Sequence, residues 1–321
     1  MDIAITGSIA YDYLMRFPGK FHEHIIADKL DHLSVSFLVE DMKRHWGGVA
    51  ANIAYTLALL RQTPPPKLVG TAGKDFGEYR AWLENAGVDT SPVCQIDDVF
   101  TASCFINTDA VNSQIVTFAS GAMAYARNFA LAELLPNRPD FVVISPNDPG
   151  AMRRYVDECR ASGIPFMYDP SQQVAWMDGT SIRYGIERCN ILICNDYEFE
   201  IILQKTGWTL EGVLDCVPTV IITRGEQGSS IYTEGTCITV PVFPAERIAD
   251  PTGVGDAFRA GVLRGLSAGW PWKLCGEVGA LCATYVLENV GTQNHTFTPA
   301  QFAARFRTVF DDQGALDALS G

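Results

Sequence analysis

Five short runs of apolar, mostly β-branched residues recur along the chain. They are IAIT, FVVI, IPFMYD, ILIC and TVIIT, at residues 3–6, 141–144, 164–169, 191–194 and 219–223. Strands with so little polar character are covered on both faces, which is typical of parallel sheets in α/β proteins. The intervening stretches 148–163 and 195–207 begin with a capping residue and end at glycine, as helices do. This alternation predicts an α/β fold with a doubly wound, mostly parallel sheet flanked by helices.

A different pattern, in which apolar and polar residues alternate, occurs at 33–40, 100–107 and 114–118. Alternation is typical of strands with one exposed face. We expect these strands to form a small antiparallel sheet that covers the ligand-binding ends of the parallel strands, although an ordinary edge hairpin would read the same way. The expected division is a large α/β nucleotide-binding and catalytic domain (1–14, 47–97 and 119–321) and a small β-sheet lid (15–46 and 98–118).

Charge and cysteine usage limit the partners. The formal net charge of the 321 residues is −13, so nucleic acid and anionic membranes are not expected partners. The nine cysteines have no zinc-binding spacing, and we expect them to be reduced. The N-terminus lacks the basic segment of a signal peptide, and no apolar run approaches the roughly 18 residues of a membrane span. A cytoplasmic protein is therefore expected.

The stretch DPTGVGDAF, residues 250–258, carries the clearest chemistry. Pro251 disfavours helix before it and an amphipathic run follows, so the glycines lie at a helix N-terminus. Amides there lack helical partners and attract anions, so Gly253, Val254 and Gly255 would form an anion hole for a phosphoryl group. Asp256 beside this hole would accept a proton from an attacking hydroxyl. An acid placed only for the helix dipole is the alternative, and neither the Walker A nor the Rossmann fingerprint occurs here.

Four segments in the same order resemble those of the ribokinase-like carbohydrate and nucleoside kinases. They are WGGVAANIAYTLALL (46–60), NDYE (195–198), TRGEQGSSIY (223–232) and DPTGVGDAFRAG (250–261). The stretches ITGSIAYDYLMRFPGKF, LSVSFLVEDM and YDPSQQ are similar to the bacterial adenosine kinases within this family. The resemblance implies a ribokinase-like fold with a β lid, and a reaction in which ATP and adenosine give ADP and AMP, a step of purine salvage.

The resemblance also implies roles for individual residues. Substrate-binding residues would be Ser8, Asp12, Ser36, Gly47, Gly48, Asn52, Phe118, Gln172 and Gln173. The ATP site would comprise Asn195, Thr223, Gly225, Gly228 and Arg259, with Asn195 and Glu198 serving Mg²⁺ through water. A monovalent cation such as K⁺ would lie near Asp250 and the 288–292 loop. The small-molecule partners would be adenosine and ATP, and the exposed lid strands would allow a homodimer.

The chemistry of these residue types agrees with a nucleoside. Asp12 and Asn52 offer an acceptor and amide groups to a ribose diol, and Phe118 could stack on a base. Structural alternatives stay open: Asp12 as a turn residue, Asn52 in a local bond, Phe118 in packing, the two glutamines at the surface, and Glu198 as a first-turn acid. For Arg259, a phosphate contact and an ion pair are both open.

One position departs from the adenosine kinases. Cys104 stands where they carry a phenylalanine against the base, and the adjacent Phe105 would face the other side of its strand. The preference for a purine is therefore expected to be looser. The competing hypotheses are a kinase for a free sugar such as ribose or fructose, or for another nucleoside, and a nucleoside-binding regulatory protein without turnover.

Overall fold

The computed structural model describes residues 1–25 and 34–319, and it contains two sheets. The larger sheet has the order β13-β12-β11-β10-β9-β8-β1-β4-β5. The strands from β11 to β5 in this order are paired in parallel, and β12 and β13 are added by antiparallel pairing. The expected α/β fold with a mostly parallel sheet is confirmed. Its strands are β1 (Ile3–Thr6), β4 (Lys67–Gly73), β5 (Val93–Ile96), β8 (Phe141–Ile144), β9 (Phe166–Tyr168), β10 (Ile191–Asn195), β11 (Thr219–Thr223), β12 (Ser229–Thr233) and β13 (Thr236–Val240).

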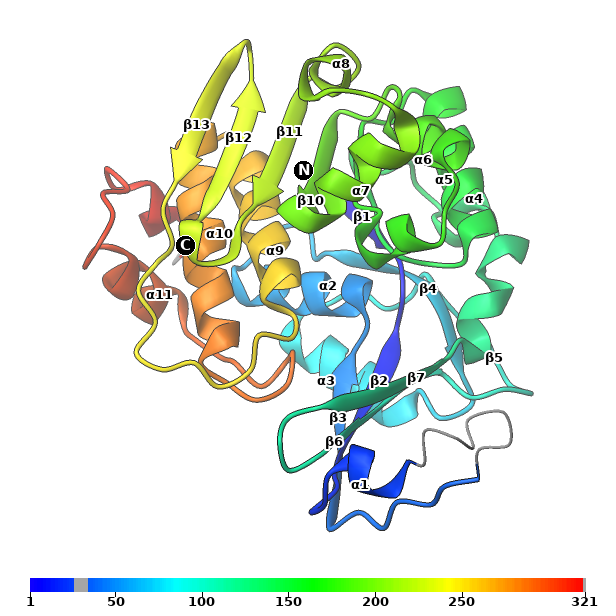
Figure 1. Ribbon diagram of the computed structural model, residues 1–321. Helices are drawn as coiled ribbons and strands as arrows, with labels where there is room; N and C mark the ends of the chain where they lie inside the picture. Colours follow the sequence, from blue (N-terminus) through cyan, green and yellow to red (C-terminus); the bar gives the residue numbers. More distant parts are fainter. Residues whose placement is uncertain (26–33, 320–321) are drawn as a thin grey trace.

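Helices cover both faces of this sheet, as Figure 1 shows. One face packs against α2 and α9, and the other against α5, α6 and α7, so the strands are buried on both sides. A third apolar cluster joins α10 to the C-terminal α11. The larger helices are α2 (Val49–Leu59), α3 (Gly77–Ala86), α5 (Pro149–Ser162), α6 (Gly179–Ile186), α7 (Asp196–Thr206), α9 (Val254–Ala268), α10 (Trp272–Leu287) and α11 (Pro299–Phe306). The short α-helices are α1 (Phe21–His24), α4 (Leu131–Leu134) and α8 (Leu210–Leu214). The 3₁₀ segments are η2 (Gly121–Asn128), η3 (Ser171–Ala175), η4 (Gly225–Gln227) and η5 (Ala315–Leu319).

Local signals explain where these helices begin and end. The Asp148 carboxylate accepts the Ala151 N–H at the start of α5, and Gly163 ends the helix with a φ of 63°. At the start of α7 the Asn195 side chain accepts the Glu198 N–H, and Gly207 ends the helix with a φ of 69°. None of the helices within residues 1–25 and 34–319 has both the length and the apolar character needed to cross a membrane.

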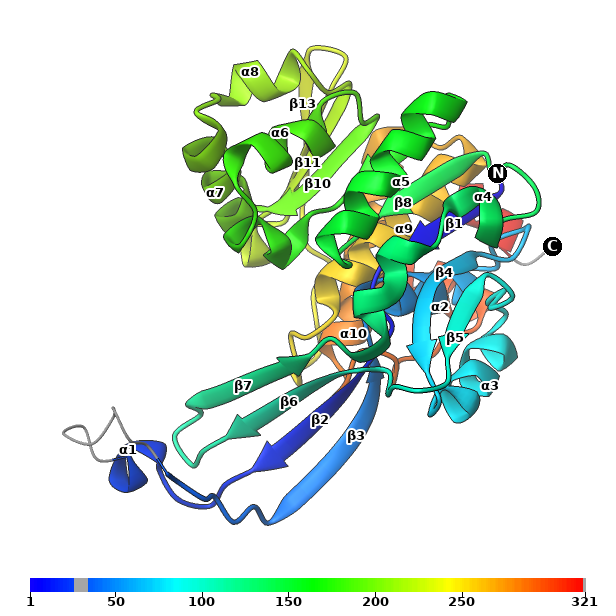
Figure 2. The same ribbon diagram turned by 90° about the vertical axis from the view of Figure 1, so that its right-hand side faces the viewer.

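The smaller sheet projects from the α/β body, as Figure 2 shows. Its order is β3-β2-β6-β7, formed by β2 (Ala10–Arg16), β3 (Asp41–Gly47), β6 (Ala102–Thr108) and β7 (Gln114–Ala119). The outer two pairings are antiparallel, but β2 and β6 run parallel. The division into body and lid stays a prediction, and β2 crosses its boundary at residues 14–15. The edge strand β7 is exposed throughout, and the homodimer also stays a prediction.

The expected strand at 33–40 was wrong. Residue 33 lies outside the described residues, and residues 34–39 form no strand. Their side chains do alternate between exposed and half-buried, and the half-buried Phe37 packs on Phe17 and Phe21 with ring centroids 5.1 and 4.9 Å apart. An irregular segment therefore has the same alternation as a strand here, and β3 follows it at Asp41–Gly47.

Candidate active site

Unpartnered amides mark the start of α9. Gly253 precedes the helix with a φ of 79°, and a Cβ there would lie 2.9 Å from Thr292, so glycine is required. The N–H groups of Gly253, Gly255 and Asp256 have no hydrogen-bond partner among residues 1–25 and 34–319. The Val254 N–H differs, since it donates to the Pro251 carbonyl across 3.4 Å. Three amides and the helix dipole thus remain for an anion.

Asp256 lies on the first turn of α9 and is partly exposed. Its Oδ2 accepts a hydrogen bond from Asn52 Nδ2 at 2.8 Å, although the two residues come from different helices. Burial raises the pKa of Asp256 to about 6, against the lowering effect of Arg259 and of the Asn52 hydrogen bond. A carboxylate with this pKa is mostly ionised at neutral pH and can accept a proton.

Arg259 forms an ion pair, one of the two expected alternatives. Its Nη2 donates to Asp169 Oδ1 at 2.6 Å, and Nε lies 2.5 Å from Oδ2, with both side chains buried. The guanidinium also lies beside Gly255, because a Cβ on this residue would be 2.7 Å from Arg259 Nη1. Arg259 therefore adds positive charge next to the open amides of α9.

Asp12 lies within β2, beside Gly47 at the end of β3, which leads into α2. A Cβ at Gly47 would be 2.3 Å from Asp12 Oδ2, so the carboxylate occupies the space that a side chain would need. The pKa of Asp12 is raised to about 7, first by burial and then by the negative charges of Asp256 and Asp250. Two acids and the Asn52 amide thus converge on one region.

The backbone approaches closely on the side of Ser8 and Gly48. Gly48 has a φ of 94°, and a Cβ there would lie 2.6 Å from both the Ser8 carbonyl and the Ala10 nitrogen. The Ser8 hydroxyl accepts the Val49 N–H at 2.9 Å, which fixes the first turn of α2. Ser8 therefore has a structural role at this position.

A row of side chains crosses the small sheet. In register, Asp12 pairs with His45 on one side and Cys104 on the other, and Cys104 pairs with Phe118. Directly paired residues share a face, so these four lie together. Phe105 lies on the opposite face, as expected, where its ring stacks on Tyr13 at 4.9 Å. Phe118 is half exposed and available on the face that carries Asp12.

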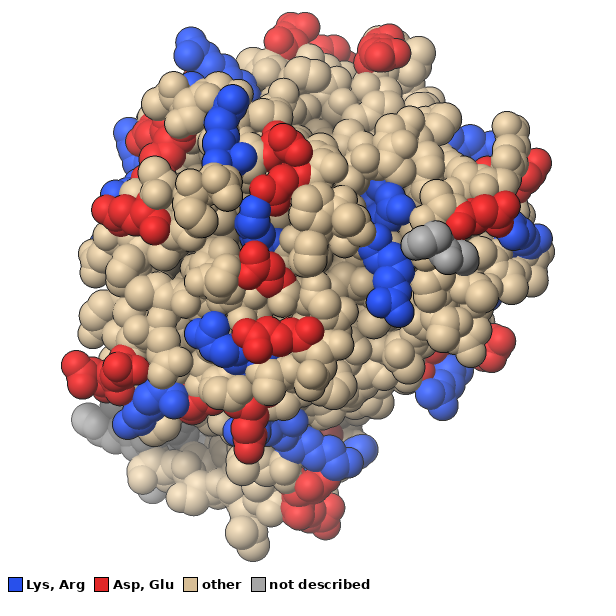
Figure 3. All heavy atoms as spheres, turned by 180° about the vertical axis from the view of Figure 1, so that it is seen from behind, with Lys and Arg blue, Asp and Glu red and all other residues tan. Residues whose placement is uncertain are grey.

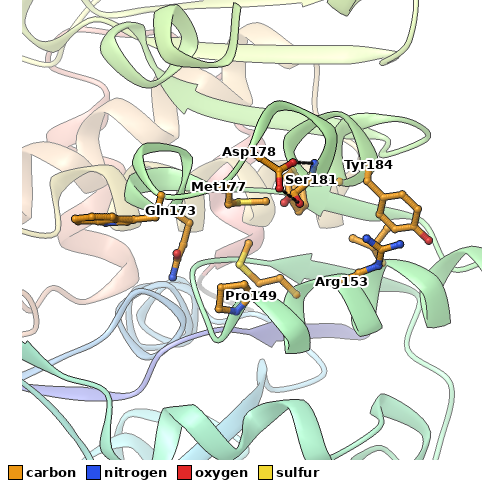
Figure 4. Close-up of a pocket in the computed structure, with 12 residues that line it drawn as sticks. Pro149, Arg153, Gln173, Met177, Asp178, Ser181 and Tyr184 are labelled. Carbon is orange, nitrogen blue, oxygen red and sulfur yellow. Dashed lines mark hydrogen bonds between the residues drawn. The ribbon is translucent and has the colours of Figure 1, made fainter. Parts of the chain in front are cut away.

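Three expected substrate residues are not arranged around this row. Ser36 is exposed outside any strand, and Gln172 is exposed on η3. Gln173 donates to the Asn147 carbonyl at 2.9 Å and lines a cavity of about 240 Å³ between α5 and α6, shown in Figure 4. None of these three side chains is therefore placed to contact a nucleoside base beside Asp12 and Phe118.

Asn195 and Glu198 form the cap of α7. Asn195 Oδ1 accepts the Glu198 N–H at 2.7 Å, Glu198 Oε2 accepts the Asn195 N–H at 2.9 Å, and Ser171 donates to Glu198 Oε1 at 3.3 Å. No group of three or more His, Cys, Asp or Glu within the described ranges could itself cage a metal. The carboxylate and amide oxygens fit Mg²⁺ held mainly by water and phosphate oxygens.

Thr223, Gly225 and Gly228 surround the tight turn between β11 and β12. The Arg224 N–H donates to the Gly228 carbonyl at 2.7 Å, and Gly228 has a φ of 82°. A Cβ on Gly228 would lie 2.1 Å from the Val240 carbonyl, whereas one on Gly225 would meet open space. At Gly225 the turn thus leaves its backbone uncovered close to Thr223, which would suit a nucleotide.

Several residues at this site were missed from the sequence. Asp169 follows β9 within the stretch YDPSQQ, and no local pattern there indicates that it pairs with Arg259. Trp82, Tyr79 and Gln293 form hydrogen bonds that reach Asn52. Gln293 is 211 residues from Trp82 and 214 residues from Tyr79 in the sequence. No local sequence pattern indicates these contacts, because only the fold brings the residues together.

The family model of the pfkB family carbohydrate kinases matches residues 12–299. The chain belongs to this family. A nucleoside kinase from Burkholderia thailandensis, solved in complex with inosine, shares 36% identity and a TM-score of 0.86, covering 96% of this chain and 98% of that one. The nucleoside kinase of Methanothermobacter thermautotrophicus is 29% identical over 308 residues, 95% of each chain.

A further solved relative is the nucleoside kinase of Methanocaldococcus jannaschii, an archaeal member of the ribokinase family. It shares 27% identity and a TM-score of 0.85, covering 96% of this chain and 99% of that one. The ribokinase-like fold expected from the motifs is thereby confirmed.

Proposed function

We propose that this pfkB family member transfers the γ-phosphoryl group of ATP to the 5′-hydroxyl of a nucleoside, with adenosine as the expected substrate. The observation that carries the proposal is Asp256, held by Asn52 beside the unpartnered amides of Gly253 and Gly255. A phosphoryl group over these amides and a hydroxyl at Asp256 would be in reach of one another.

The reaction would proceed by direct transfer. The 5′-oxygen bonds to the γ-phosphorus as the bond from that phosphorus to the β,γ-bridging oxygen breaks, so ADP leaves with the electron pair. The hydroxyl proton passes to Asp256 Oδ1 or Oδ2. The amides at the start of α9 and the nearby Arg259 stabilise charge on the transferring group. Mg²⁺, when bound with ATP near Asn195 and Glu198, supplies further neutralisation of the phosphates.

The row of side chains across the small sheet, Asp12, His45, Cys104 and Phe118, supports a nucleoside over a free sugar as the substrate. Asp12 would accept from ribose hydroxyls, and the half-exposed Phe118 on the same face would provide an aromatic surface for a base. A free sugar would not use this surface. The Burkholderia relative, solved with inosine, supports the same class of substrate.

Selectivity among bases should be modest. Cys104 gives a small side chain next to Phe118, and Gln173 already donates to backbone. We therefore expect adenosine to be accepted and inosine to be a competing substrate rather than an excluded one. The expectation for adenosine rests on the sequence motifs, and the expectation for inosine on the relative's ligand.

The test is a substrate panel at equal ATP. Adenosine, inosine, guanosine, cytidine and ribose are compared, with ADP and nucleoside 5′-monophosphate both quantified and Asp256→Asn as the inactive control. Formation of 5′-AMP supports the full proposal, and a strong preference for inosine supports a nucleoside kinase but replaces adenosine. Preference for ribose, or binding of nucleosides without ADP formation, would reject the proposed function.

A further inference from the structure

A buried amide behind Asn52 is fully hydrogen-bonded. Gln293, in the loop after α10, has 1% of its surface exposed. Its Oε1 accepts from Trp82 Nε1 at 3.1 Å, and its Nε2 donates to Asn52 Oδ1 at 2.9 Å and to the Tyr79 hydroxyl at 2.5 Å. Three elements, α2, α3 and the loop after α10, are thereby joined at one side chain.

The chemistry of the two ends fixes the direction of every bond between them. An indole N–H can only donate, so Trp82 requires Gln293 to present its oxygen on that side. The Tyr79 hydroxyl donates to the Gly47 carbonyl at 2.8 Å, so its oxygen is left to accept from Gln293 Nε2. Gln293 therefore directs an N–H at Asn52, and Asn52 must offer its Oδ1 there.

The orientation of Asn52 follows from this. With Oδ1 used by Gln293, the Nδ2 group points to Asp256 and donates to its carboxylate. A reversed Asn52 amide would place an oxygen against the carboxylate and an N–H against the N–H of Gln293. Both contacts would be repulsive, so the network allows one orientation.

We propose that Gln293, itself held by Trp82 and Tyr79, is a positioning residue that sets the Asn52 amide so that an N–H faces Asp256. The inference rests on the proposed role of Asp256 as proton acceptor. Without the Gln293 donor, the Asn52 amide can turn and stop holding the carboxylate. The orientation of the Asp256 carboxylate would then depend on the charged groups around it, which are Arg259, Glu198, Asp12 and Asp169.

The test compares two buried glutamines. Gln293→Met keeps the length of the side chain and removes its donors and acceptor. Gln62→Met is the matched control, because Gln62 is also buried and its Nε2 also makes two hydrogen bonds, to the Met1 and Thr63 carbonyls at the far end of α2. We expect kcat/KM for the nucleoside to fall about tenfold in Gln293→Met and to change less than about twofold in Gln62→Met, with similar losses in melting temperature.

A double-mutant cycle separates positioning from packing. In an Asn52→Leu background, Gln293→Met should lower kcat/KM by less than about twofold, because Gln293 would act through Asn52. Trp82→Phe, which keeps an aromatic ring and removes the indole donor, should give a smaller loss in the wild-type background. A tenfold loss in both backgrounds, or wild-type activity in Gln293→Met, would overturn the inference. Failure of the wild-type chain to phosphorylate any nucleoside would instead reject the proposed function.

Discussion

At the scale of single residues, the pKa of Asp256 connects its surroundings to its proposed role. Burial raises the pKa to about 6, while Arg259 and the Asn52 hydrogen bond keep it from rising further. The group is thus protonated below this pH and able to accept a proton above it. We expect Asp256→Asn to lower kcat by about 10³-fold with nucleoside affinity nearly unchanged. Steady-state kinetics and calorimetric binding check this, and near-normal turnover would remove Asp256 from the chemistry.

The pH profile tests the cause of the pKa. kcat should rise with pH and level off above about pH 6, since the ionised carboxylate is the active form. In Asn52→Leu, a hydrogen bond that favours the charged form is lost, so the pKa of Asp256 should rise and the acid limb should move to higher pH. The comparison is made at saturating ATP and nucleoside. An acid limb that stays in place or moves to lower pH would contradict the role of this bond.

At the scale of elements, the approach of α2 to β2 depends on a glycine. Gly48 combines a φ of 94° with two backbone atoms 2.6 Å from a Cβ. We expect Gly48→Ala to lower the free energy of unfolding by about 2 kcal/mol or more, because backbone strain and a clash with backbone add. Gly77→Ala in α3 is the control, since its Cβ would meet nothing within 4 Å. Urea unfolding measures both, and equal effects would show that the close approach is not what matters.

The two faces of the small sheet β3-β2-β6-β7 give the next prediction. Phe118 shares the face of Asp12, whereas Phe105 stacks on Tyr13 on the other face. Phe118→Ala should raise the nucleoside KM about tenfold through lost stacking, and leave the KM for ATP within about twofold. Phe105→Ala removes an aromatic ring of equal size from the far face and should leave the nucleoside KM unchanged. If both substitutions raise the nucleoside KM equally, the stability of the small sheet and not base stacking is responsible.

Strands with a strong local sequence pattern could be predicted, and strands that form only through pairing with neighbouring strands could not. The bounds of β1, β8 and β11 match their apolar runs, because a strand buried on both faces requires apolar residues at nearly every position. The strands β2 and β3 carry many polar residues, and their identity comes from register with each other and with β6. The same holds in the site, where Asp256 was recognisable beside its glycines but Gln293 was not.

At the scale of the whole molecule, charges of both signs are interspersed over the face seen in Figure 3. With a formal net charge of −13, the overall field does not favour an anionic ligand. The proposed binding of a phosphate would therefore depend on local donors, chiefly the open amides of α9 and the guanidinium of Arg259. The carboxylates of Asp12, Asp250 and Asp256 lie in the same region, and their mutual repulsion is expected to lower the stability of the fold.

Asp12 provides the test of that cost. Burial, then the charges of Asp256 and Asp250, raise its pKa to about 7, so the folded state binds a proton that the unfolded state releases near pH 4. The stability that this proton contributes is present at low pH and is lost as the pH rises through about 7. Replacing the carboxyl by an amide removes the charged form. Asp12→Asn should therefore raise the free energy of unfolding at pH 8 by ~1–2 kcal/mol more than at pH 5, while impairing nucleoside binding.

Asp109 serves as a control of opposite sign. Burial would raise its pKa, but the N–H groups of Phe21, Ser113 and Val111 outweigh burial and lower it. A lowered pKa contributes stability that is present above the unfolded-state pKa and lost in acid. Asp109→Asn should therefore destabilise the protein about equally at pH 5 and pH 8, which both lie above its pKa, and less below about pH 4. Urea unfolding of both variants at pH 5 and pH 8, and of Asp109→Asn also at about pH 3, measures the contrast. A stability gain of Asp12→Asn that is equal at the two pH values, or larger at pH 5, would mean that its carboxylate is not held at a cost to the fold, and the convergence of acids at the start of α9 would then need a compensating cation.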